Sequence, residues 1–193
     1  MLTLDPKTTA LVVIDLQRGI LALPMTPHDG GDVVARSVAL GRALAAAGGV
    51  IVLVNVDYSA RYADRPNQPA DAPLNLPAEG LPAGWATLAP EVAALPAEVR
   101  ITKRQHSAFF GTELDLQLRR RGITAVVISG LATNFGVEAT ARDAHALNYA
   151  VVIASDACSS TAPGLHDFAV THILPRIARV RTSSEIVAAL AAG

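Results

Sequence analysis

Short apolar runs alternate along the chain with segments whose apolar residues recur at helical spacing. Continuous runs rich in valine and isoleucine are typical of parallel strands that helices cover on both faces. The repeated alternation therefore predicts an α/β fold, with a three-layer α/β/α Rossmann-like arrangement around one parallel sheet. We expect strands at residues 10–15, 50–56, 99–103, 125–129, 149–154 and 177–181.

Helices are expected between the strands, where polar residues precede a helical period. Asp32 suits the N-cap of a helix that runs to about residue 47, and Gly48-Gly49 suits its end. Thr112-Glu113-Leu114-Asp115 resembles a capping box for a helix that ends at Arg121, with an acidic residue in place of the usual Glu or Gln. Further helices are expected at 135–147, at 164–174 and from residue 183.

One long segment, from about residue 57 to residue 98, interrupts the alternation and holds seven of the twelve prolines. The runs on either side of it are predicted to belong to one sheet. Long loops of this kind usually serve as lids or binding loops. We therefore expect an excursion that carries function rather than a linker between domains, and residues 1–193 are predicted to form a single domain.

Composition narrows the class of protein further. Hydrophobic residues make up 51% of the chain, charged residues 17%, and the formal net charge is -1. These values argue against a disordered protein and against a nucleic-acid partner, and no uncharged apolar stretch is long enough to predict a membrane span. The first residues lack the pattern of a signal peptide, and the single Cys158 has no intramolecular disulfide partner. The cytoplasm is the expected location.

Polar residues at the predicted strand ends nominate a site. A doubly wound sheet binds its ligand beyond the carboxyl ends of its strands, where Asp15, Lys103 and the turn 130–136 are expected to meet. Asp15 is either a general acid or base, tuned by burial and by the cation of Lys103, or a structural cap. The turn opens a helix, so its free N–H groups favour an anion or a developing oxyanion.

Three blocks of sequence together resemble one family. They are ALVVIDLQRGI, ITKRQHSAFFGTELDLQLRRRGI and VVISGLATNFGVEATARDAHALNYAVVIASDACSS, and they extend over most of the chain. The blocks are similar to the isochorismatase-like, or cysteine hydrolase, superfamily. This resemblance implies a six-stranded parallel sheet in the order 3-2-1-4-5-6 and a triad of Asp, Lys and Cys. Asp15 and Lys103 match the first two residues, whereas Gly136 stands at the position of the cysteine.

Glycine at position 136 changes the implied chemistry, because no acyl-enzyme can form on it. True isochorismatases resemble this chain there: they hydrolyse a vinyl ether by protonation from the aspartate followed by addition of water. The resemblance therefore implies Asp15 as the proton donor, with Lys103 holding substrate or tuning the acid. Cys158 is expected to be a packed structural residue, with thiol chemistry as a minor alternative.

The resemblance also implies a binding pocket around the turn. Family members have a non-proline cis peptide there, which in this chain would join Ala132 to Thr133. Backbone groups of residues 132–135, Ala132, Thr133, Asn134 and Phe135, would surround the reacting centre. His106 and Phe109 are candidates for the pocket wall, although surface or core roles are open to both.

In the excursion, Tyr58, Arg61 and Tyr62 could recognise a carboxylated small molecule, or they could be solvated surface residues. No cofactor is expected. The five histidines form neither an HxH nor an HExxH pattern, so no metal site is predicted. Family members are commonly homo-oligomers, which implies a dimer or tetramer.

Two functions remain open from the sequence. One is a hydrolase that acts on a small metabolite with Asp15 as general acid or base and water as nucleophile. The other is a non-catalytic binding or assembly protein that keeps the crevice without the reaction.

Overall fold

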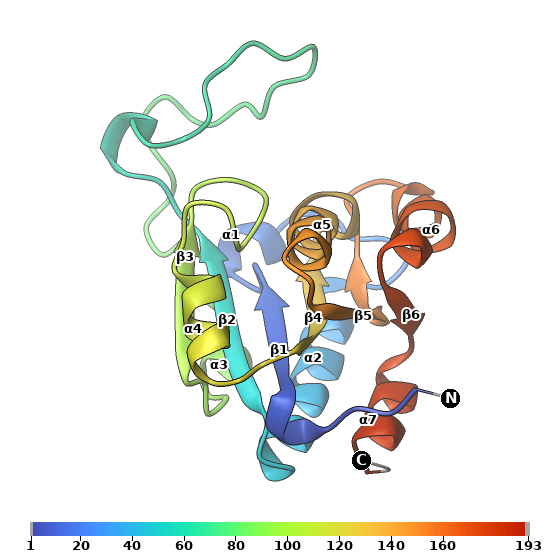
Figure 1. Cartoon of the computed structure of the whole chain (residues 1–193). Helices are drawn as coiled ribbons and strands as arrows, with labels where there is room; N and C mark the ends of the chain where they lie inside the picture. Colours follow the sequence, from blue (N-terminus) through green and yellow to red (C-terminus); the bar gives the residue numbers. More distant parts are fainter. Residues whose placement is uncertain (1, 192–193) are drawn as a thin grey trace.

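The computed structural model describes residues 2–191 and has three layers, in which helices cover both faces of one sheet (Figure 1). The sheet is parallel throughout, and its order is β3-β2-β1-β4-β5-β6. The predicted fold class and strand order are therefore confirmed. The strands are β1 (Thr9–Ile14), β2 (Val50–Val56), β3 (Val99–Lys103), β4 (Ala125–Leu131), β5 (Ala150–Ser159) and β6 (Arg179–Arg181).

The helices divide between the two faces because alternate strand residues point to opposite sides. In β1, Ala10, Val12 and Ile14 face one core, and Leu11 and Val13 face the other. The first core is closed by α4 (Leu114–Arg120) and α5 (Glu138–Ala146), and the second by α2 (Gly30–Ala46), α3 (Pro90–Ala93) and α7 (Ser183–Ala191). Short helices α1 (Arg18–Leu21) and α6 (Leu165–Phe168) lie near the carboxyl edge of the sheet (Figure 1).

Several element boundaries differ from the expectations. Asp29 rather than Asp32 caps α2, because its side chain accepts from the Asp32 N–H at 2.8 Å. Thr112 accepts from the N–H of Leu114 at 3.1 Å, but the reciprocal bond of a capping box is absent from the described chain, and Asp115 instead accepts from the hydroxyl of Tyr149. The cap residues were thus misplaced by a few positions.

The segments after β4 and β5 also differ from regular helices. The predicted helix at 135–147 begins as a wide turn over Thr133–Val137 and continues as α5. The predicted helix at 164–174 is divided into α6, a second wide turn (Ala169–Ile173) and a short 3-10 turn (Leu174–Arg176). Strand β5 runs five residues further than expected, to Ser159, with a shift in its register against β4.

Gly130 allows β4 to pass close to β1 at the carboxyl edge. Its φ is +116°, and a Cβ atom there would lie 2.1 Å from the backbone oxygen of Ile14. No other residue fits this conformation and this distance. Because Gly130 lies three residues before Thr133, where the wide turn begins, this contact brings the turn beside the end of β1.

Candidate active site

Asp15 follows the last residue of β1 in a backbone conformation that only a few non-glycine residues adopt. Its φ is +53°, its N–H donates to Val54 at 3.0 Å, and its carbonyl accepts from the N–H of Gln17 at 2.8 Å. Such conformations cost about 1–3 kcal/mol and persist where the surroundings impose them. The hydrogen bonds on both sides therefore turn the chain at Asp15 out of the sheet.

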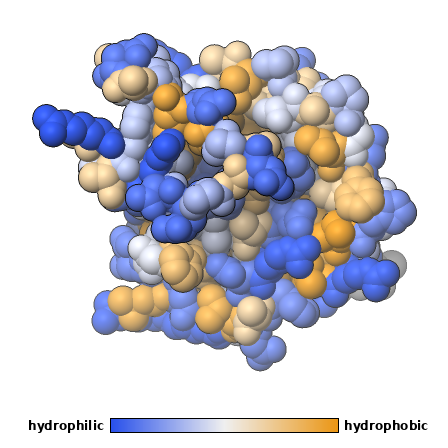
Figure 2. Space-filling model, turned by 90° about the horizontal axis from the view of Figure 1, so that it is seen from above, coloured by the Kyte–Doolittle hydropathy of each residue, from blue (hydrophilic) through white to orange (hydrophobic). Residues whose placement is uncertain are grey.

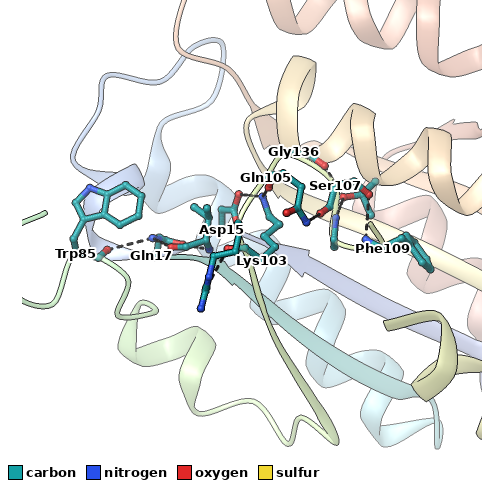
Figure 3. Close-up of polar contacts among 12 residues, drawn as sticks. Asp15, Gln17, Trp85, Lys103, Gln105, Ser107, Phe109 and Gly136 are labelled. Atoms are coloured by element: carbon teal, nitrogen blue, oxygen red, sulfur yellow. Dashed lines mark hydrogen bonds and ion pairs between the residues drawn. The ribbon is translucent and has the colours of Figure 1, made fainter. Parts of the chain in front are cut away.

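Asp15 and Lys103 form a buried ion pair. Lys103 is the last residue of β3, and its Nζ donates to Asp15 Oδ2 at 2.7 Å, while the side chains are 2% and 8% exposed for Lys103 and Asp15. Lys103 Nζ also donates to the carbonyl of Gln105 at 3.2 Å. Two strand ends separated by 88 residues thus supply one charge pair, as Figure 3 shows.

The carboxyl of Asp15 titrates far above its ordinary range. Burial raises its pKa from 3.8 to about 6, against the charge and the hydrogen bond of Lys103, which lower it. Its Oδ1 atom is buried and has no hydrogen-bond partner within residues 2–191. Because Lys103 occupies Oδ2, a proton on the neutral acid belongs on Oδ1. The carboxyl of Asp15 can therefore be either ionised or protonated near neutral pH, and in its protonated form it can donate a proton.

Gly136 lies against this pair. A Cβ atom at this position would be 3.3 Å from Asp15 Oδ2, 3.0 Å from Ile14 Cγ2 and 3.2 Å from the Leu131 carbonyl. The three residues Asp15, Lys103 and Gly136 are therefore brought together, although glycine offers no side chain of its own (Figure 3).

A non-proline cis peptide lies just before the turn Thr133–Val137, but it joins Leu131 to Ala132. The expectation that it would join Ala132 to Thr133 was wrong by one residue. The carbonyl of Ala132 accepts from the N–H groups of Phe135 and Val137 at 3.1 and 3.2 Å. The backbone N–H of Phe135 is therefore already occupied and does not face a ligand as a free donor.

The side chains of the turn are held in different ways. Thr133 is buried and donates to the carbonyl of Ser159 at 2.9 Å. Asn134 accepts through Oδ1 from the hydroxyl of Ser160. Phe135 is 48% exposed, and its ring stacks on His106 with a centroid separation of 5.3 Å. The turn is thus anchored through Thr133 and Asn134 and presents Phe135 outward.

Phe109 does not lie with the pair. Its ring belongs to the core, against Tyr149 at a centroid separation of 5.7 Å, and it points away from Asp15 in Figure 3. The core role left open for Phe109 is the one that the structure gives it. His106 is exposed and stacks on Phe135, and burial followed by the charge of Lys103 lowers its pKa.

The excursion forms an open cavity of about 710 Å³ between its two limbs. Its outgoing limb contributes Tyr58, Arg61 and Tyr62, and its returning limb contributes residues that include Glu79 and Trp85. The tip between the limbs projects away from the body (Figure 1), and the edge from which it rises is hollowed when viewed from above (Figure 2).

The cavity and the ion pair are neighbours rather than one space. Of the described residues, those that line the cavity do not include Asp15, Lys103 or Gly136. Tyr58 lines the cavity, and burial first and then the charge of Asp15 raise the pKa of its hydroxyl.

Gln17 and Trp85 hold the returning limb in place, and neither was predicted. Gln17 is fully buried, and its amide bonds to the N–H and carbonyl of Val56 at 2.9 and 3.0 Å and to the carbonyl of Trp85 at 3.3 Å. The Trp85 indole lies over Gly19, where a Cβ atom would be 2.0 Å from its Nε1. The available sequence clue was the position of Gln17, an uncharged polar residue between Leu16 and Arg18 just after the apolar run that ends at Asp15.

A second unpredicted group joins the turn to the loop that follows Lys103. The buried hydroxyl of Thr140 donates to the carbonyl of Gly136 at 2.6 Å and accepts from the N–H of Ala108 at 3.1 Å. Nearby, the Ser107 hydroxyl donates to Asp143 Oδ2 at 2.6 Å. Both strand-end loops that carry the site are thus fastened to α5.

The remaining chemistry of the chain is limited. Cys158 is fully buried in the first core, and burial raises the pKa of its thiol to about 12. Within residues 2–191, no group of three or more His, Cys, Asp or Glu side chains could hold a metal ion. Over the same residues, no helix combines the length and apolar character needed to cross a membrane.

The fold and the paired strand-end residues define a doubly wound α/β protein with a polar site at its carboxyl edge. The isochorismatase domain model matches residues 9–185. The chain therefore belongs to the isochorismatase family.

Several relatives match over most of their length. The isochorismatase family protein YecD of Escherichia coli O157:H7 is 49% identical over 98% of this chain and 100% of its own. The ureidoacrylate amidohydrolase RutB of Caulobacter vibrioides is 31% identical over 84% of this chain and 81% of its own. An isochorismatase family protein from Burkholderia thailandensis has a solved structure with a TM-score of 0.92 and 44% identity, covering 99% of both chains.

Proposed function

We propose that this protein is a hydrolase that acts on a small carboxylated metabolite, with Asp15 as general acid and water as nucleophile. The observation that carries the proposal is the buried Asp15–Lys103 pair beside Gly136, in which the pKa of Asp15 rises to about 6. A general acid works best when its pKa is near the working pH. Membership of a family whose relatives include a named amidohydrolase supports a hydrolytic reaction.

The reaction follows from which groups carry protons. Neutral Asp15 gives its proton to the carbon of an enol ether, and the carbon that bears the ether oxygen becomes an oxocarbenium ion. Water adds to that carbon and returns a proton to Asp15, and the resulting hemiketal breaks down to a ketone and an alcohol. Between the two proton transfers Asp15 is ionised, and the positive charge of Lys103 stabilises this buried carboxylate. Gly136 forms no covalent intermediate, since it has no nucleophile.

The excursion supplies the proposed recognition of the carboxylate. Arg61 lines the cavity, is exposed, and forms no ion pair with a carboxylate of the described chain. A guanidinium binds a carboxylate through two parallel hydrogen bonds. Tyr58 lines the same cavity, and the charge of Asp15 raises the pKa of its hydroxyl, so we expect Tyr58 to contact a substrate that extends from the cavity to the acid.

The test is a panel of carboxylated enol ethers together with carboxylated amides and ureido compounds, incubated in D2O. Protonation by Asp15 places one solvent deuterium on carbon in the ketone from an enol ether, which mass spectrometry detects. We expect turnover to fall as pH rises through about 6, because the acid form of Asp15 is lost. Asp15→Asn should abolish it, whereas Asp71→Asn, on the exposed part of the excursion, should not.

Turnover that is indifferent to Asp15→Asn would refute the role of this residue. Ligand-induced thermal stabilisation without any product, across the panel, would favour the non-catalytic binding protein instead. A covalent adduct on the intact protein would contradict the direct attack of water.

A further inference from the structure

His166 is a buried histidine that the proposed reaction does not use. It lies on α6, where its neighbours Leu165 and Phe168 are 38% and 59% exposed, whereas His166 is 5% exposed. A short surface helix has little reason to bury a titratable ring unless the ring has a specific partner. The partner here is Thr133, the first residue of the turn that carries Gly136.

The hydrogen bonds of Thr133 fix the state of the ring. The Thr133 hydroxyl lies 2.9 Å from the carbonyl of Ser159 and 2.8 Å from Nδ1 of His166. A carbonyl oxygen can only accept, so the one hydroxyl proton of Thr133 is best used toward Ser159. Both bonds form only if His166 Nδ1 carries a proton and donates it to Thr133. The arrangement therefore selects the neutral Nδ1–H tautomer, with the lone pair on Nε2.

The surroundings of the ring also favour its neutral form. His28 packs edge to face against it with a centroid separation of 5.8 Å, and the backbone of His28 is held by the Ser159 hydroxyl. Asp167, the next residue in the sequence, is exposed, and its negative charge favours the protonated form of His166. Burial first, then His28, lower the pKa of His166, and Asp167 opposes them.

We propose that His166 is a positioning residue that holds the turn from Thr133 to Gly136 against Asp15. The proposal rests on the function proposed above. The physical link is short: Thr133 and Gly136 lie in the same five-residue turn, and a Cβ atom at Gly136 would be 3.3 Å from Asp15 Oδ2. Without His166, Thr133 keeps its bond to Ser159 but loses one of the contacts that fix the turn, so the turn can shift from Asp15 and admit water to the carboxyl.

The consequence is measurable without any substrate. Burial is the largest cause of the raised pKa of Asp15, so water admitted beside it brings that pKa down toward the ordinary 3.8. His166→Leu should therefore lower the pKa of Asp15, which can be followed by the 13C shift of its carboxyl during a pH titration. We expect a fall of at least about half a pH unit.

His166→Asn is the conservative variant, because an asparagine amide can place an N–H donor near the position of Nδ1. We expect it to keep the pKa of Asp15 close to that of the wild type. His145→Leu, which replaces an exposed histidine of α5, is the matched control and should leave the pKa unchanged. Unfolding midpoints of all three variants separate a loss of positioning from a general loss of stability.

Thr133 offers a second route if His166→Leu fails to fold. Thr133→Ser keeps the hydroxyl and should retain the pKa of Asp15, whereas Thr133→Val removes it and should lower the pKa. Where a substrate is in hand, kcat should fall by about 10- to 100-fold in His166→Leu with a smaller change in KM, since a misplaced turn affects the reacting centre. Equal effects of Leu and Asn at position 166, or of Val and Ser at position 133, would overturn the proposal.

The readouts distinguish this proposal from the function on which it rests. If the whole panel gives no product, the reaction is wrong, but the titration of Asp15 still tests whether His166 positions the turn. If product forms and the pKa of Asp15 does not respond to His166→Leu, the reaction stands and the positioning role is refuted.

Discussion

Replacing Lys103 by methionine tests the electrostatics of the site most directly. Methionine keeps an unbranched, flexible side chain but removes the ammonium group that lies 2.7 Å from Asp15 Oδ2. In the wild type, the rise of the Asp15 pKa from 3.8 to about 6 means that the charged carboxyl costs about 3 kcal/mol of stability above pH 6. Without Lys103, the effect of burial is unopposed, and the pKa rises further.

The size of that rise follows from the cost of breaking a buried pair. Removing one partner typically costs about 3–5 kcal/mol, which corresponds to raising the pKa by about 2 to 4. Asp15 in Lys103→Met would then stay protonated at neutral pH while the unfolded chain is ionised. The native state of Lys103→Met then holds one proton, on Asp15, that the unfolded state has lost. The free energy of unfolding of this variant therefore falls, relative to the wild type, by about 1.4 kcal/mol for each pH unit above pH 6.

The assay is urea unfolding of both proteins at several pH values between about pH 6.5 and about pH 8. Lys7→Met replaces the only other lysine, which is exposed, and should show no such slope. Asp15→Asn combined with Lys103→Met should also remove the slope, because no carboxyl is left to titrate. A stability difference that does not change with pH would refute the reasoning, since Asp15 would then remain ionised without its partner.

Three further predictions concern groups around the pair. Gly136→Ala should lower the free energy of unfolding by about 1–3 kcal/mol, because its Cβ would press on Ile14 and Asp15 at 3.0 and 3.3 Å; an unchanged urea midpoint would contradict this. Thr140→Val should lower the free energy of unfolding by about 1–3 kcal/mol, because the Gly136 carbonyl and the Ala108 N–H both lose their hydrogen bond to the buried hydroxyl. Thr140→Ser keeps the hydroxyl and should recover most of that loss. Cys158 should react with a thiol reagent only after unfolding, and rapid labelling of the native protein would show that it is not buried.

The sheet was predictable because its information is local. An inner strand of this parallel sheet is buried on both faces and leaves a run of apolar residues, as in β1 and β4, whose residues are all buried. The position of Asp15 was predictable as well, because a charged residue directly after such a run lies at the edge where ligands bind, and Lys103 ends a strand at the same edge. The order of the strands required the family resemblance.

The contacts that complete the site were not predictable in the same way. Gln17, Thr140 and His166 act through partners that lie between 4 and 68 residues away, and their own sequence neighbours do not identify those partners. Phe109 shows the converse problem, because an aromatic residue near Lys103 fits a pocket wall or the core equally well. Only packing against Tyr149 decides between them.

The absence of a side chain at Gly136 and the unusual pKa of Asp15 have a common structural basis. The turn approaches Asp15 so closely that even a Cβ atom would be crowded, and this approach contributes to the burial that raises the pKa to about 6. At pH 7, a carboxyl with that pKa is protonated in about one molecule in ten, against about one in a thousand for an ordinary aspartate. In the proposed reaction, the same packing that would crowd a Cβ atom at position 136 also favours Asp15 as an acid, whereas a thiol at that position would require Asp15 to act as a base.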